Sequence, residues 1–120
     1  ELIKPGMFAA EFGYRLMQEL LPLRPDAVFC GGDTAAIGAI RAIHEAGLRV
    51  PDDIAVVGFD DLDVATKITP ALTTIRHRVM DIGSTAARLL IDLLDGRLEH
   101  PHHFVMPTEL VIRGSTGGQG

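Results

Sequence analysis

The chain has 120 residues, enough for a single domain with one modest hydrophobic core. Its 11 basic and 16 acidic residues give a net charge of −5, which leaves no basic stripe for direct nucleic-acid binding. The single cysteine, Cys30, excludes an internal disulfide and fits a reducing compartment, and no apolar run reaches the ~20 residues of a membrane span. We therefore expect a cytoplasmic protein that does not contact a membrane.

The first third of the chain predicts a helix, a strand and a second helix. Apolar residues at helical spacing predict an amphipathic helix from Phe8 to Leu21. The apolar run Ala27–Gly31 predicts a strand buried on both faces. A second helix follows from Thr34 to Ala46, with Asp33 or Thr34 as its N-cap.

The rest of the chain continues the alternation of strands and helices. Ile54–Gly58 predicts a second buried strand, and the β-α-β order with a connection of ~20 residues predicts parallel strands. Leu72–Ile75 is expected to be extended, Met80–Leu94 to form an amphipathic helix and Glu109–Arg113 a last strand. Gly114–Gly120 has the composition of a mobile tail. The predicted fold class is α/β with a parallel sheet.

The helix Thr34–Ala46 is apolar around much of its circumference. One face must pack on the sheet, and the remaining apolar surface indicates either a subunit interface or a second covering layer. The residues concerned are Ala35, Ala36, Ile37, Ala39, Ile40, Ala42, Ile43 and Ala46.

Two carboxylates, Asp60 and Asp61, directly follow the second strand, at the edge where open α/β sheets bind ligands. Three roles stay open for them: a loop or helix cap, hydrogen bonding to a ligand, or catalysis. Adjacent residues leaving a strand point in opposite directions, which disfavours a catalytic pair.

Two other segments suggest chemistry less strongly. The amides of Gly31–Thr34 could hold an anionic or polar group, although a tight turn with an Asp cap is the favoured interpretation. The segment His100–His103 invites a metal hypothesis, but it lacks Cys or carboxylate partners at zinc spacing, so a solvated loop is favoured. No catalytic set is evident, and we expect no enzyme activity, no metal and no cofactor.

Several phrases between Gly6 and Arg113 follow one another in an order and spacing that are specific in combination. They are RPDAVF (24–29), GD (32–33), GA (38–39), GLRVPDD (47–53), VGFDD (57–61), PALTTI (70–75) and LVIRGS (110–115). The chain thereby resembles about the final third of the lactose/galactose-repressor family of bacterial transcription regulators. The resemblance implies a periplasmic-binding-protein-like (flavodoxin-like) subdomain that is incomplete.

The resemblance also implies roles for particular residues. Asp60 matches a carboxylate that hydrogen-bonds the effector, and Phe8 matches an aromatic that packs against a sugar or purine ring. Gly32 stands where many sugar-responsive members carry an Asn that contacts ligand, so the chain departs from their pattern there. The phrases at 28–33 and 69–75 look most like the purine-responsive branch. The residues implied at the dimer interface are Ala36, Ile37, Ile40, Arg41, His44 and Ile68.

In this family pattern, residues 1–76 and 107–115 belong to the C-terminal subdomain, 77–106 cross to the N-terminal subdomain, and 116–120 form a flexible tail. The helix from about Val79 to Asp95 would then lose its usual partner. We expect it to fold back onto its own sheet, to exchange with another copy, or to belong to a longer polypeptide. A well-folded monomer in solution with that helix exposed would contradict this expectation.

The leading hypothesis is the effector-sensing and dimerisation portion of a ligand-responsive regulator. Its partners would be a small sugar, nucleoside or purine effector and a second copy of itself. Operator DNA would be bound only through a headpiece outside this chain. The alternatives are a solute-binding protein of an uptake system, which shares the fold, and a small α/β enzyme using Asp60 and Asp61.

Overall fold

The computed structural model describes residues 1–99 and 103–118, and its contacts divide them into two compact units. The first comprises Glu1–Arg76 together with the stretch from Leu110, and the second comprises His77–Glu109. The assignment of the second unit to another subdomain stays a prediction.

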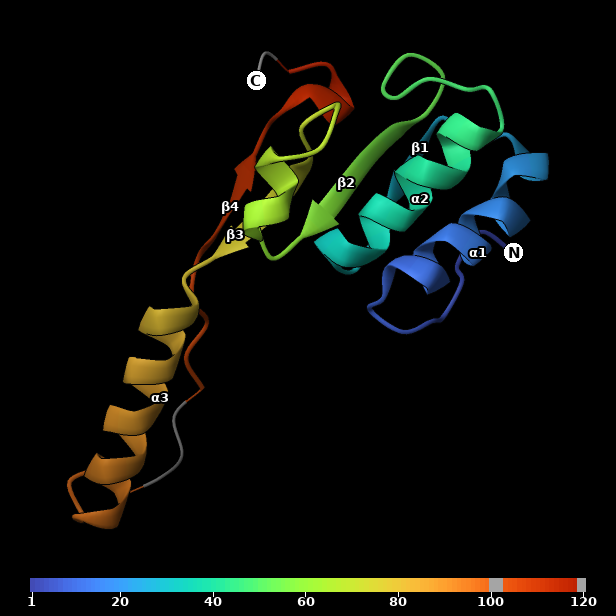
Figure 1. Cartoon of the computed structure of the whole chain (residues 1–120). Helices are drawn as coiled ribbons and strands as arrows, with labels where there is room; N and C mark the ends of the chain where they lie inside the picture. Colours follow the sequence, from blue (N-terminus) through green and yellow to red (C-terminus); the bar gives the residue numbers. More distant parts are fainter. Residues whose placement is uncertain (100–102, 119–120) are drawn as a thin grey trace. The chain divides into compact units, whose positions relative to one another are not determined.

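A four-stranded sheet has the strand order β1-β2-β3-β4 (Figure 1). Its members are β1 (Ala27–Phe29), β2 (Ala55–Phe59), β3 (Thr73–His77) and β4 (Thr108–Val111). Both β1 and β3 pair with β2 in parallel, with Val28 opposite Val56 and Gly58 opposite Thr74. The predicted α/β class and the parallel strands are therefore confirmed.

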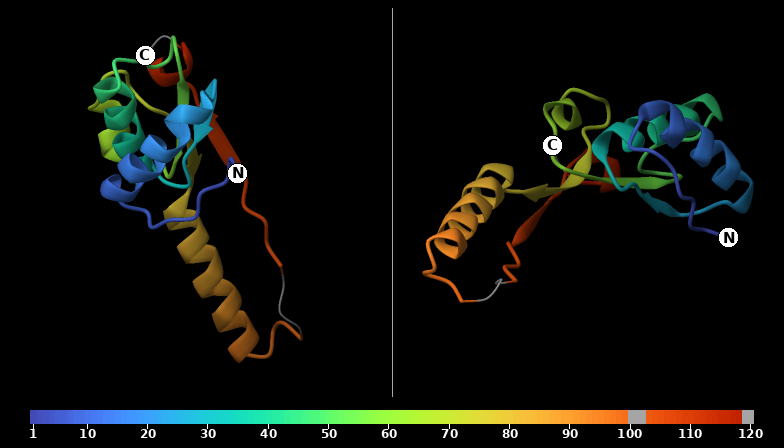
Figure 2. Two further views of the ribbon diagram at one scale, coloured as in Figure 1. Left: turned by 90° about the vertical axis from the view of Figure 1, so that its right-hand side faces the viewer. Right: turned by 90° about the horizontal axis from the view of Figure 1, so that it is seen from below.

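Two helices, α1 (Ala10–Leu20) and α2 (Asp33–Glu45), lie side by side, and α2 packs on β2 (Figure 1, Figure 2). Their backbones meet closely because two glycines lie at the contact. A Cβ atom at Gly13 would overlap the carbonyl oxygen of Ala35, and one at Gly38 would overlap that of Ala10. The extra apolar surface of α2 is thus covered by α1. Of the two interpretations, a subunit interface or a second covering layer, the structure supports the covering layer on that side.

The core of the first unit is aliphatic and joins both helices to the sheet. Burying each large aliphatic side chain contributes about 1.5–3 kcal/mol, so these contacts dominate the stability of the unit. The buried apolar residues are Met17, Leu20, Ala36, Ala39, Ile40, Ala42, Ile43, Val50, Ile54, Val56, Ala65 and Leu72.

The prediction that the first strand is buried on both faces is wrong. Val28 packs against the core, whereas Ala27 is exposed and Phe29 is 62% exposed. Because side chains alternate along a strand, Ala27 and Phe29 point to the face opposite Val28. The position of β1 at the end of the strand order adds to this exposure.

The segment Gly114–Thr116, expected to belong to a mobile tail, is instead folded against the sheet, whereas the flexibility expected of the tail beyond it stays a prediction. Residues Gly114–Thr116 form the short 3-10 helix η3, and Ser115 is fully buried. The Ser115 hydroxyl donates to the carbonyl oxygen of Val56 at 2.6 Å and accepts from the amide of Thr73 at 2.8 Å. These bonds fix the segment to the sheet despite its glycine content. Residues 119 and 120 lie outside the described part.

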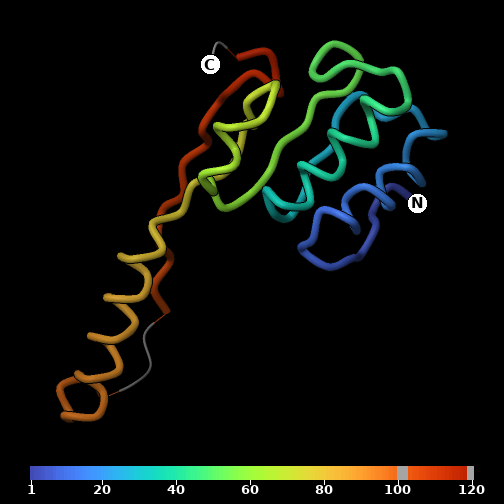
Figure 3. The backbone as a smooth tube through the Cα atoms, in the orientation of Figure 1, coloured from blue at the N-terminus to red at the C-terminus, as the bar shows by residue number. Residues whose placement is uncertain are grey.

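Two further 3-10 helices are η1 (Leu21–Leu23) and η2 (Asp63–Thr66), and the path from β2 through η2 to β3 can be followed in Figure 3. In the second unit, α3 (Val79–Leu94) matches the predicted helix, but it has no buried residue. Its apolar side chains include Leu90 and Leu94, which are 57% and 77% exposed. Across residues 1–99 and 103–118, the helices are too short or too polar for a membrane span.

Candidate functional site

The two predicted ligand-binding residues Phe8 and Asp60 lie together with Gly32, which stands where many family members carry a ligand-contacting Asn. A Cβ atom placed on Gly32 would be 3.2 Å from Cδ1 of Phe8 and 3.7 Å from Oδ2 of Asp60. The Phe8 ring is 74% exposed, and Asp60 is half-buried. Gly32 follows β1 and Asp60 follows β2, so the group stands at the carboxyl edge of the parallel sheet, where open α/β sheets bind ligands.

The glycines beneath the Phe8 ring allow this close approach. A Cβ atom on Gly31 would be only 3.0 Å from Cε1 of Phe8, so a side chain at either Gly31 or Gly32 would push the ring away. The wall therefore presents an aromatic ring over a bare backbone, with one carboxylate beside it. Such a wall can stack on a flat ligand ring and accept a hydrogen bond from it.

The turn that carries Asp60 has an uncommon backbone. Asp60 and Asp61 have φ angles of 105° and 54°, a region that L-residues other than Asn and Asp seldom occupy. Such conformations cost on the order of 1–3 kcal/mol each and persist only where the surroundings fix them. The contacts around this turn therefore bear directly on where the Asp60 carboxylate points.

Asp33 is one of those contacts, and its predicted role as a helix cap is wrong. Gly32 occupies the N-cap of α2 and no side chain caps that end, while Asp33 is the first helical residue. The Asp33 carboxylate is fully buried and accepts hydrogen bonds from the Leu62 amide at 2.7 Å and the Thr74 hydroxyl at 2.5 Å. Both donors are protein groups, so the buried carboxylate is hydrogen-bonded without water.

Asp61 is fixed by two arginines. Arg113 Nη2 donates to Asp61 Oδ1 at 2.7 Å, and Arg76 Nε donates to Oδ2 at 2.6 Å. The Asp61 and Arg113 side chains are only 9% and 12% exposed. Burial by itself would raise the pKa of the Asp61 carboxyl, but the hydrogen bonds from Arg113 and Arg76 outweigh it and hold that pKa below its ordinary value. Asp61 is therefore a structural anion.

The lowered pKa of Asp61 predicts a pH-dependent contribution to stability. That contribution is present above the unfolded pKa of about 3.9 and is lost as the pH falls through the lower folded pKa. We expect Asp61→Asn to lower the free energy of unfolding by about 2 kcal/mol at neutral pH. The deficit should narrow below about pH 4, as measured by urea denaturation across pH. A deficit that widens in acid would contradict this.

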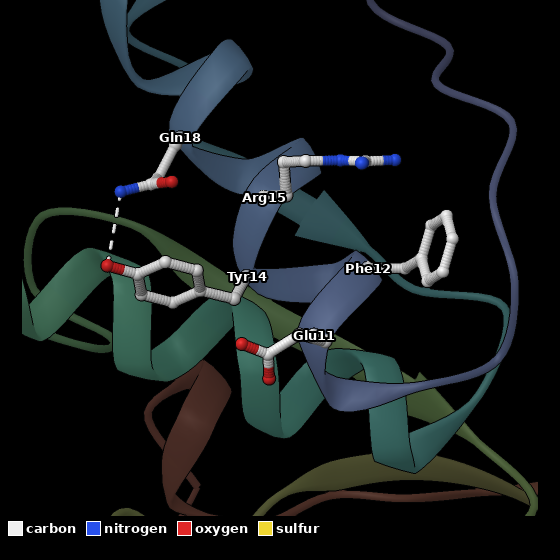
Figure 4. A pocket seen from close by; sticks show the side chains of 5 residues that line it. All are labelled: Glu11, Phe12, Tyr14, Arg15 and Gln18. Carbon is white, nitrogen blue, oxygen red and sulfur yellow. Dashed lines mark hydrogen bonds between the residues drawn. The ribbon is translucent and has the colours of Figure 1, made fainter.

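The surface of the first unit is hollowed at α1. A groove of about 610 Å³ runs between residues 2–8, α1 and β1; Phe8 and Gly31 line it, whereas Gly32 and Asp60 do not. A smaller hollow of about 280 Å³ lies on α1 and contains none of the predicted site residues (Figure 4). Here the Tyr14 hydroxyl accepts from Gln18 and donates to Glu45 of α2, so the tyrosine serves the contact between the helices. The smaller hollow is not the candidate site.

The predicted dimer residues do not all offer a surface. Ala36 and Ile40 are 0% and 5% exposed within the chain, so their assignment to an interface is wrong: they belong to the core. Arg41 is exposed and stacks 4.2 Å from the Tyr14 ring centre. The partly or fully accessible residues of the set are Ile37, Arg41, His44 and Ile68.

Other reactive groups do not form a second site in the described residues. Burial raises the pKa of the Cys30 thiol to about 11, so it is not a reactive nucleophile at neutral pH. Within 1–99 and 103–118, no three His, Cys, Asp or Glu residues gather as metal ligands. Of the histidine segment, His100 and His102 lie outside the described residues, and His103 is exposed.

Sequence reasoning missed the supporting roles of Thr74 and Arg113. Thr74 lies in the phrase PALTTI and Arg113 in the phrase LVIRGS. Both phrases carried the family resemblance, and this was the only signal in the sequence that could have pointed to the two residues. Their partners are 41 and 52 residues away along the chain, at Asp33 and Asp61. A local pattern could not pair residues so far apart.

Comparisons with known proteins point in one direction. A family model described as a periplasmic binding protein-like domain matches residues 4–116. The chain is 44% identical over 115 residues to the HTH-type transcriptional repressor PurR of Escherichia coli. That alignment covers 94% of this chain and 34% of the repressor, so the chain spans about a third of the length of this relative.

Solved structures agree with this. A complex of the transcriptional regulator CelR with cellobiose superposes with a TM-score of 0.87 at 38% identity, covering 92% of this chain and 34% of the other. The lac repressor dimer bound to operator and the anti-inducer ONPF superposes with a TM-score of 0.86 at 35% identity, covering 95% of this chain and 36% of the other. A LacI family regulator from Enterococcus faecium with bound ribose superposes with a TM-score of 0.81 at 33% identity, covering 93% of this chain and 42% of the other. These relatives are transcriptional regulators.

Proposed function

The chain belongs to the periplasmic-binding-protein-like domains of LacI-family transcriptional regulators, and from this premise we propose that it is the effector-binding portion of such a regulator. The observation that carries the proposal is the grouping of Phe8, Gly32 and Asp60 at the carboxyl edge of the sheet. These residues would form one wall of the effector site. Effector binding would act on operator DNA through the rest of the regulator, in the cytoplasm.

The chemistry of this wall favours a flat, nitrogen-containing ring over a sugar. A sugar presents several hydroxyl groups and needs several polar partners, whereas Gly32 adds no side-chain hydrogen bond here. A purine presents a planar face for the Phe8 ring and an N–H donor for the Asp60 carboxylate. The resemblance of residues 28–33 and 69–75 to the purine-responsive branch supports the same choice. We therefore propose a purine-like effector.

Calorimetric titration of the full-length protein with hypoxanthine, guanine, ribose and cellobiose tests the effector class. We expect hypoxanthine or guanine to bind and both sugars to give no heat of binding. Binding of a sugar with no response to either purine would overturn the effector class and leave the regulator proposal standing. If none of the four probes bound, the result would count against both the purine-like effector and the regulator proposal.

We also propose that the full-length protein is a homodimer that uses the exposed part of α2 and the loop after β2. Ile37 is half-buried in the single chain and would be covered by the partner. Ile37→Glu would place a charge in that contact, and we expect the dissociation constant of the dimer to rise by at least about tenfold. Sedimentation at several concentrations measures this constant.

The matched control is Leu23→Glu, which makes the same kind of change at an apolar side chain that is 52% exposed in η1. It should leave the dissociation constant unchanged. Equal dimerisation of the Ile37→Glu variant and the wild type would remove α2 from the interface.

A further inference from the structure

One buried carboxylate, that of Asp33, lies between Gly32 and the turn that carries Asp60. Its Oδ2 accepts from the Leu62 amide at 2.7 Å, just beyond the left-handed residues Asp60 and Asp61. Its Oδ1 accepts from the Thr74 hydroxyl on β3 at 2.5 Å. Asp33 is also the residue after Gly32, so its carboxylate connects the backbone at Gly32 with the turn that carries Asp60.

Thr74 completes this connection from the side of the sheet. Its hydroxyl oxygen accepts from the Asp61 amide at 3.4 Å while its proton goes to Asp33, so one side chain touches both the turn and the carboxylate. Thr74 and Asp33 are each fully buried. Neither bond can therefore be replaced by water at low cost.

The backbone next to Asp33 and Thr74 leaves room for the Asp33 carboxylate. Gly58 on β2 faces Asp33, and a Cβ atom on Gly58 would overlap Oδ1 of that carboxylate. The Asp60 amide donates to the carbonyl oxygen of Ile75 at 2.9 Å, which anchors the start of the turn to β3. The turn is thus held at its first residue by the backbone and beyond it by Asp33 and Thr74, together with the two arginines that hold the Asp61 carboxylate.

We propose that Asp33 and Thr74 are positioning residues for the effector: they set the distance between Gly32 and the Asp60 carboxylate without touching the ligand. This inference rests on the proposed function of Phe8, Gly32 and Asp60. It separates two tasks in the neighbouring carboxylates, because Asp60 binds the ligand while Asp33 fixes the geometry. Loss of the Thr74 hydroxyl releases the Asp61 amide and one oxygen of Asp33 together.

The test compares Thr74→Val, Thr74→Ser and Thr73→Val in the full-length protein. Valine keeps the shape of threonine but removes the hydroxyl, whereas serine keeps the hydroxyl. Thr73 is also buried, and its hydroxyl bonds to the Arg113 backbone and to Thr116 rather than to Asp33 or to the Asp61 amide. Thr73→Val therefore controls for the general loss of a buried hydroxyl.

Calorimetry with hypoxanthine, guanine, ribose and cellobiose is run at a temperature where all variants are folded. Thr74→Val is expected to weaken binding of the probe that the wild type binds by about tenfold, and Thr74→Ser and Thr73→Val by less than about threefold. Equal weakening in Thr74→Val and Thr73→Val, or none in either, would overturn the positioning role.

A crystal structure of Thr74→Val decides the matter independently of any ligand. We expect the Asp60–Asp61 turn to relax and the Asp60 carboxylate to move away from Gly32. An unchanged turn would overturn the inference. If the wild type binds none of the probes but the turn moves in the variant, the proposed function fails while the structural link from Thr74 to Asp60 stands.

Discussion

Gly38→Ala is expected to lower the free energy of unfolding by about 3 kcal/mol, at the upper end of what overpacking usually costs. The added methyl group would overlap the carbonyl oxygen of Ala10, a rigid backbone atom in α1. Relief requires the two helices to separate, which opens the contacts among the buried residues between them. Urea denaturation of the chain, followed by circular dichroism, measures the change.

Gly83→Ala in α3 is the matched control for that substitution. Gly83 is also a helical glycine, but nothing lies within 4 Å of a Cβ atom placed there. Alanine is the better helix former, so this variant should gain about 0.5–1 kcal/mol or show no change. If Gly38→Ala behaved like Gly83→Ala, the close packing of α1 on α2 would be contradicted.

Asp60→Asn is expected to weaken effector binding by about 10- to 100-fold, because a hydrogen bond to a charged group contributes about 1.5–3 kcal/mol. Asparagine has the same shape and also tolerates positive φ angles, so the turn at residue 60 should persist. The loss would then report on the carboxylate itself. Calorimetric titration of the full-length variant with the probe that the wild type binds gives the value.

Asp63→Asn provides the control on the same loop. The Asp63 side chain is 98% exposed and pairs only loosely with Lys67, at 4.0 Å. Its substitution should leave the affinity unchanged, since exposed ion pairs contribute little. Equal affinities for the wild type and both variants would show that Asp60 does not bind the ligand.

The sequence was most informative where the rule was local or geometric. Apolar runs and the β-α-β spacing predicted the parallel sheet, because strands joined by a helical crossover run in the same direction. Phe8, Gly32 and Asp60 were proposed from the family resemblance. The sheet explains why they meet, since Gly32 and Asp60 follow the carboxyl ends of adjacent strands.

The errors arose where a residue had two physically reasonable partners. An aspartate at the start of a helix suits a cap, but Asp33 instead accepts from Leu62 and Thr74, which lie 29 and 41 residues further along. Apolar periodicity showed that Ala36 and Ile40 must be covered, but it could not say that elements of the same chain cover them.

Composition misled at the C-terminus for a related reason. A glycine-rich stretch favours mobility, yet the single hydroxyl of Ser115 bonds to the Val56 carbonyl in the core. That bond joins residues 59 positions apart, so no window of the sequence reveals it.

A crystal structure of the full-length protein with a bound probe, hypoxanthine first, tests the central claim most directly. The ligand ring is expected against Phe8, with the Asp60 carboxylate within hydrogen-bonding distance of a ligand N–H. A ligand bound elsewhere, with Phe8 and Asp60 both out of contact, would contradict the assignment of this edge of the sheet as the effector site.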